Sequence, residues 1–157
     1  MYATAREFFE SAREAARDAE RIRRQLDAME SRSLSLGSGG FEPRVRSTPD
    51  PDRIGASVSA MLDQGERLRE RADEDYAVID AACRVLYGAD NRSGLYALVG
   101  WPADAIYHHY LALRTWEETA AMLGYSVQHV RRQVLCVLDL ADANGQMWTE
   151  LGRGMAT

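Results

Sequence analysis

The order of helix caps in one segment decides the fold of the C-terminal third. Residues 103–142 read ADAIYHHYLALRTWEETAAMLGYSVQHVRRQVLCVLDLAD. Thr115 is a favourable N-cap, and Glu118 three residues later completes a capping box, so we expect a helix to begin at Trp116. Gly124 stands where a left-handed C-cap would end this helix. The segment therefore predicts a short helix followed by a tight turn.

A second helix is expected directly after that turn. Ser126 is the next N-cap, and apolar residues recur with helical spacing over residues 127–142. Two helices joined by a short turn with a glycine have the geometry that places the second helix in the major groove of DNA. Gln and Arg are the side chains that bind adenine and guanine edges bidentately. The candidate base-contacting residues that project from the apolar stripe are Gln128, His129, Arg131, Arg132 and Gln133.

Phosphate contacts are expected at the start of the first helix. Arg114 and the cap at Thr115 are placed to hold a phosphate, as is the helix N-terminus at Trp116.

Residues 103–142 resemble region 4 of bacterial sigma factors, and more closely the phage-encoded RinA/ArpU-like late transcriptional regulators. The residues that carry the resemblance are Tyr110-Leu111, Thr115-Trp116-Glu117-Glu118, Ala120-Ala121, Leu123-Gly124-Tyr125-Ser126, His129-Val130 and Leu138. The resemblance implies control of phage or prophage late genes, with base contacts from Val127, Gln128, His129, Arg131 and Arg132. One departure is the end of the second helix, which carries Asp139 and Asp142 where basic residues are usual.

The first half of the chain is expected to form a helical hairpin. Residues 1–30 carry a heptad seam in which half of the positions are alanine. Residues 31–53 are rich in Gly, Ser and Pro and predict a mobile connector. Apolar spacing resumes from Asp52 or Pro51 to Leu86, interrupted at Gly65, and residues 87–94 form the next break. The members of the two seams are Ala5, Phe8, Ala12, Ala15, Ala19, Ile22, Leu26 and Met29, then Ile54, Val58, Met61, Leu68, Ala72, Tyr76 and Ile79.

These patterns predict an all-α fold with two regions. Residues 1–87 would form a coiled-coil-like hairpin that mediates self-association or contact with RNA polymerase. Residues 95–157 would form the helix-turn-helix domain with a C-terminal tail. An alanine-rich seam supplies little apolar area, so we expect a homo-oligomer, with a dimer favoured.

Charge and composition narrow the function classes. The chain has 157 residues, a net charge of −5, and arginine as its basic residue throughout, without lysine. Residues 101–157 hold 4 basic and 6 acidic side chains, which predicts weak non-specific attraction to DNA. No secretory signal or membrane-length apolar run is found, so a cytoplasmic location is expected. No pattern indicates a catalytic site, a cofactor or a metal site, so we do not expect an enzyme.

The sequence thus favours a sequence-specific, DNA-binding transcriptional regulator. Two alternatives stay open. One is a small terminase-like subunit for DNA packaging, which would form a ring. The other is an adaptor that binds RNA polymerase or a sigma factor without contacting DNA.

Overall fold

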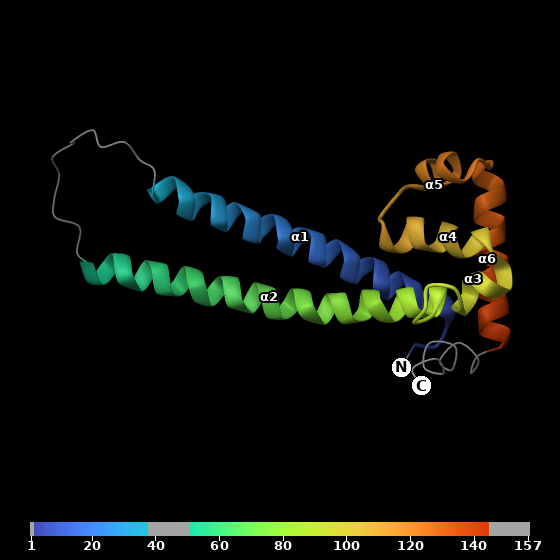
Figure 1. Ribbon diagram of the computed structural model, residues 1–157, viewed down its shortest axis with the longest axis horizontal. Coiled ribbons are helices and arrows are strands. Elements are labelled where there is room, and N and C mark those ends of the chain that lie inside the picture. The colour runs from blue at the N-terminus through green and yellow to red at the C-terminus, as the bar shows by residue number, and fades with distance from the viewer. Residues whose placement is uncertain (1, 38–50, 145–157) are drawn as a thin grey trace. The chain divides into compact units, whose positions relative to one another are not determined.

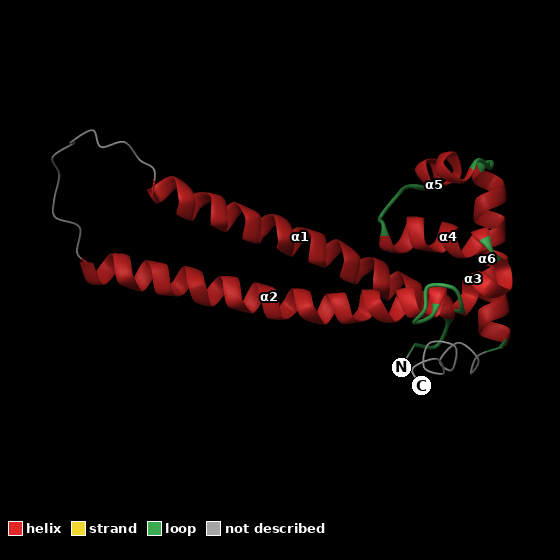
Figure 2. Cartoon of the chain, viewed as in Figure 1, coloured by secondary structure: helices red, strands yellow, loops and turns green. Residues whose placement is uncertain are grey.

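The protein is all-helical in the computed structural model, which describes residues 2–37 and 51–144. No strand occurs in these two ranges, which confirms the predicted all-α class (Figure 2). No helix in them is both long and apolar enough to cross a membrane. The elements are α1 (Ala5–Gly37), α2 (Pro51–Tyr87), α3 (Gly94–Val99), α4 (Trp101–Ile106), the π-helix η1 (Tyr107–Leu111), α5 (Trp116–Leu123) and α6 (Val127–Ala143).

The predicted connector over residues 31–53 was placed too wide. Helix α1 continues to Gly37, and α2 begins at Pro51. The serines that suggested a break are accommodated inside the helix: the hydroxyl of Ser33 donates to the carbonyl of Glu30 at 2.8 Å, and that of Ser35 to Arg32 at 2.9 Å. The remainder of the connector, 38–50, and the tail from 145 onward lie outside the described residues.

Residues 18–74 form one compact unit, in which α1 and α2 run antiparallel (Figure 1). Asp18 pairs with Arg71 at 2.6 Å, while Met29 lies near Gly65. Gly65 is buried, and a Cβ there would lie 3.7 Å from the Met29 methyl carbon. The Met29 side chain thus reaches the glycine that interrupts the second seam, where a Cβ would make an ordinary van der Waals contact with it.

The two apolar seams are confirmed in part. Ala12, Ala15, Ala19 and Ile22 are buried as expected, but Phe9 is fully buried where Phe8 was predicted. In α2, Ala72 and Leu86 are buried, whereas Val58 and Tyr76 are 48% and 50% exposed. The seam prediction is wrong at these two positions, whose side chains face solvent.

Within the described residues, the second compact unit combines residues 2–17 with residues 75–144. Its hydrophobic core includes Phe9 and Ala12 from α1, Leu86 from α2, and Val130 and Leu138 from α6. This division differs from the predicted one, in which all of 1–87 formed a separate region. The first turns of α1 belong to the unit that contains the helix-turn-helix.

Candidate nucleic-acid interface

Three short helical elements hold α6 in place within the second unit. Helix α6 packs against α4 and α5, and α5 also contacts α4 and η1. The buried face of α6 consists of Val130, Val134, Val137, Leu138 and Ala141. Thr119 and Ala120 of α5 are buried with them. The opposite face of α6 is left exposed.

The turn between α5 and α6 has the predicted caps. The Thr115 hydroxyl accepts the N–H of Glu118 at 3.1 Å, and the Glu118 carboxylate accepts the N–H of Thr115 at 2.8 Å. Gly124 adopts the left-handed conformation, with φ 76° and ψ 26°. The Ser126 hydroxyl accepts the N–H of His129 at 3.3 Å and starts α6. The capping box, the glycine C-cap and the second N-cap are all confirmed, and they define a helix-turn-helix.

Gln128 and Arg132 lie at the centre of the exposed face of α6. Both side chains are exposed, and positions 128 and 132 are one helical turn apart on the side away from the buried Val130 and Val134. Leu135 and Asp139 continue this face toward the C-terminus and are also exposed. The exposed face of α6 is therefore polar at its start, and further along it carries the apolar Leu135 and the acidic Asp139.

Arg131 lies at one flank of α6, beside an aromatic stack. The Trp116 ring stacks on the His109 ring with 3.6 Å between centroids and an interplanar angle of 18°. The guanidinium carbon of Arg131 lies 5.8 Å from the centroid of the Trp116 ring, in cation–π contact. Trp116, predicted to contact DNA, is half-buried in this stack. Its main role in the structure is to support Arg131 and His109.

His129 lies at the opposite flank and contacts a second aromatic pair. Trp101 and Tyr125 stack with 4.3 Å between ring centroids. The His129 ring is 5.6 Å from Trp101 and 5.4 Å from Tyr125. His129 is exposed, while the neighbouring Val127, predicted to face bases, is half-buried and packs against the core. The flanks of α6 are thus each fixed by an aromatic pair.

The backbone between His109 and Trp116 contains a π-helical turn and Leu113 in the left-handed conformation, and the two rings stack across it. In η1, the N–H of Ala112 donates to the carbonyl of Tyr107 at 2.9 Å, and Leu113 follows with φ 58°. The His109 Nδ1 then bonds the carbonyl of Arg114 at 3.0 Å. A carbonyl can only accept, so Nδ1 carries the proton and donates. Nothing in the residue spacing predicted this π-helix.

The electrostatic environment of His109 is strongly positive. Burial lowers the pKa of His109 to about 4, and the charges of Arg13, Arg131 and Arg17 contribute in the same direction. Burial also lowers the pKa of His108, with Arg114 adding to the effect. The two histidines are therefore neutral at pH 7 and lie among guanidinium groups.

The predicted phosphate contacts at the start of α5 lie beside two carboxylates, which have the same sign of charge as a phosphate. Arg114 and Thr115 are exposed at this end. Glu117 and Glu118 occupy the first turn, and the Glu118 carboxylate already accepts the N–H of Thr115. An anion at this helix end would be repelled by two carboxylates. Arg114 remains a candidate phosphate contact, and the Thr115 side chain is engaged in capping.

Two arginines of α1 were missed by the sequence reasoning. Arg13 Nη1 donates to the carbonyl of His109 at 2.5 Å, and Arg17, one turn further along α1, is exposed. In the sequence they occupy polar heptad positions, which any solvent-facing helix would show.

The described residues contain no group of three or more potential metal ligands. No family model, curated protein or solved structure matches this chain, so its function is inferred from the geometry of this helix-turn-helix and its arginines.

Proposed function

We propose that this protein binds double-stranded DNA in the cytoplasm and regulates transcription, as a regulator of phage or prophage type. The observation that carries the proposal is the capped α5–turn–α6 arrangement, which leaves Gln128 and Arg132 at the centre of an exposed helix face. Helix α6 would enter the major groove with this face toward the bases.

The spacing of Gln128 and Arg132 along α6 would allow each side chain to contact a different base pair. Four residues of α-helix rise about 6 Å, which is close to two base-pair steps of B-form DNA at roughly 3.4 Å each. Gln binds adenine bidentately and Arg binds guanine bidentately, with about 1–3 kcal/mol of discrimination for each good pair. Arg131 and His129, held at the flanks by aromatic rings, would contact the groove walls and backbone.

Selection from a random pool of duplexes tests the proposal. The full-length protein should enrich a common sequence, and the Gln128→Ala/Arg132→Ala variant should bind that sequence at least tenfold more weakly. A matched control is Gln64→Ala/Arg67→Ala, which removes the same residue types from exposed positions of α2. Failure of the wild-type protein to enrich any sequence would overturn sequence-specific reading. Retention of RNA polymerase that survives nuclease treatment would then favour the adaptor.

We propose that residues 18–74 associate with a second copy of the chain. Leu34, Val58 and Leu62 are 68%, 48% and 63% exposed, respectively, which is unusual for large apolar side chains on a paired helix. Two DNA-binding units in one particle would raise affinity without new contacts. Sedimentation velocity should give a dimer that dissociates in the Val58→Glu/Leu62→Glu variant. A large ring would favour the packaging subunit instead.

A further inference from the structure

The first turns of α1 are part of the unit that contains the helix-turn-helix. Phe9 and Ala12 are buried in the same core as Val130 and Leu138 of α6. Arg13 is tied to the element before α5 by its bond to the His109 carbonyl. The positions of Arg13 and of Arg17, one turn later, are therefore defined relative to α5 and α6.

Four arginines gather around the His109–Trp116 stack. Two of them contact it directly: Arg13 of α1 donates to the His109 carbonyl, and Arg131 lies over the Trp116 ring. Arg17 follows Arg13 by one turn of α1, and the backbone carbonyl of Arg114, just before α5, accepts from the His109 ring. Burial is the main reason that the pKa of each imidazole is lowered; the charges of Arg13, Arg131 and Arg17 lower the pKa of His109 further, and that of Arg114 lowers the pKa of His108. None of the four forms an ion pair with any carboxylate in the part of the chain that the structure describes. Their positive charge is therefore available to a ligand.

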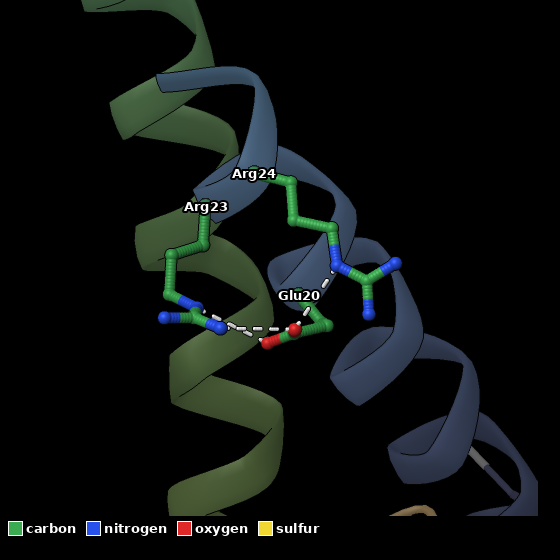
Figure 3. A network of polar contacts seen from close by, with 3 residues as sticks. All are labelled: Glu20, Arg23 and Arg24. Carbon is green, nitrogen blue, oxygen red and sulfur yellow. Dashed lines mark hydrogen bonds and ion pairs between the residues drawn. The ribbon is translucent and has the colours of Figure 1, made fainter. Parts of the chain in front are cut away.

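Two arginines further along α1, Arg23 and Arg24, do form ion pairs with a carboxylate. Glu20 accepts from Arg23 at 3.0 and 3.1 Å and from Arg24 at 3.2 Å (Figure 3). This carboxylate partly neutralises both guanidinium groups. Within one helix, the charges at 13 and 17 are unpaired, whereas those at 23 and 24 are paired.

We propose that Arg13 and Arg17, together with Arg114 and Arg131, form a surface that binds the phosphate backbone of duplex DNA alongside the groove entered by α6. This inference rests on the proposed function and adds a contact outside the helix-turn-helix. Guanidinium groups bind phosphate bidentately. Arg13 and Arg17 add two cations from α1 to the two that residues 101–157 contribute to this surface, while residues 1–17 as a whole are neutral, with three arginines and three glutamates.

Salt-dependent binding of a fluorescein-labelled 30-base-pair duplex of mixed sequence tests this surface. We compare the full-length protein with Arg13→Gln/Arg17→Gln and with the matched control Arg23→Gln/Arg24→Gln, which removes the same charge from the same helix. If each arginine contacts one phosphate, the slope of log K against log salt becomes shallower by about 2 in the first variant. Affinity near 0.1 M salt should then fall about 10- to 100-fold, with little change in the control.

The single variant Arg17→Gln guards against a folding defect, since Arg17 is exposed and makes no hydrogen bond in the described part of the chain. It should make the slope shallower by about 1 while leaving the circular dichroism spectrum unchanged. Equal binding by wild type and Arg13→Gln/Arg17→Gln would overturn this inference and leave base reading by Gln128 and Arg132 standing. Equal losses in both double variants would also overturn it, because net charge alone would then explain the effect.

Two further outcomes separate the inference from the proposed function. If the wild-type protein binds no duplex at 50 mM salt, both are overturned. If a single-stranded RNA of the same sequence binds more tightly than the duplex, the backbone of duplex DNA is the wrong partner for these arginines.

Discussion

Lowering the pH from 7.5 to 5.0 should destabilise the unit that contains the helix-turn-helix through His109. Its neutral ring stacks on Trp116 and donates from Nδ1 to the Arg114 carbonyl. A second proton, on Nε2, would add positive charge to a partly buried site that already contains Arg13 and Arg131. Burial, the largest cause, and these charges hold the pKa of His109 at about 4 in the folded protein.

The sign and size of this loss of stability follow from the difference between the pKa of His109 in the folded and in the unfolded protein. A histidine in an unfolded chain has a pKa of about 6.5, so protons favour unfolding once the pH falls below that value. The loss of stability is absent above about pH 6.5, grows as the pH falls toward 4, and then levels off. At pH 5 the full shift corresponds to roughly 2 kcal/mol of unfolding free energy. Water reaches part of the ring, so we expect about 1 kcal/mol.

Urea unfolding of wild type and His109→Asn at the two pH values measures this contribution. The asparagine can still donate to the Arg114 carbonyl but does not titrate, and it loses the stack with Trp116. Wild type should be the more stable protein at pH 7.5, and its advantage should shrink by about 1 kcal/mol at pH 5.0. The control Gln128→Ala changes an exposed side chain of α6 that does not titrate and should leave the pH dependence of wild type intact. An advantage that stays constant between the two pH values would refute the assignment of His109 as the titrating group.

Substitutions at four further positions test the local structure by urea unfolding. Thr115→Ala removes the capping box with Glu118 and should cost about 1 kcal/mol, with Thr115→Ser close to wild type; equal stability of all three would contradict the cap. Gly124→Ala should cost roughly 1–2 kcal/mol for its left-handed backbone alone, because its Cβ would meet open space. Gly94→Ala should cost clearly more, since its Cβ would lie 2.7 Å from the backbone nitrogen of Gly88, and a smaller cost than at Gly124 would be inconsistent with this packing. Leu138→Ala should cost about 2–5 kcal/mol as a core truncation, and a loss below 1 kcal/mol would mean that Leu138 is not in the core.

Features that depend on residues three or four apart could be predicted from the sequence. The caps at Thr115 and Ser126 and the turn at Gly124 were confirmed because each uses a side chain or backbone conformation that acts within one helical turn. The exposure of Gln128 and Arg132 followed from helical periodicity in the same way. Local rules therefore predicted the helix-turn-helix almost completely.

Features that depend on tertiary contacts could not be predicted. Arg13 looks like any polar heptad position, and only the burial of Phe9 beside it shows that this turn packs with the C-terminal elements. Tyr125 is 44% exposed and stacks on Trp101 from a distant part of the chain, a contact that the local sequence does not indicate. The π-helix over 107–111 has no local signature, since its extra residue is accommodated by packing on both sides.

The split of one core between the two ends of the chain has a consequence for biosynthesis. Phe9 leaves the ribosome early, but its core partner Leu138 is made roughly 130 residues later, which takes about ten seconds at ordinary elongation rates. Until then the aromatic side chain of Phe9 lacks part of its core, because Tyr110 of η1 and the apolar face of α6 are made late. A fragment that starts after Tyr87, the obvious choice for isolating the helix-turn-helix, would lack Phe9, Ala12, Ala82 and Leu86 from its core. Expression of the C-terminal segment alone should therefore yield an aggregation-prone product, and co-expression with residues 1–87, which supply all four missing core residues, should restore it to the soluble fraction.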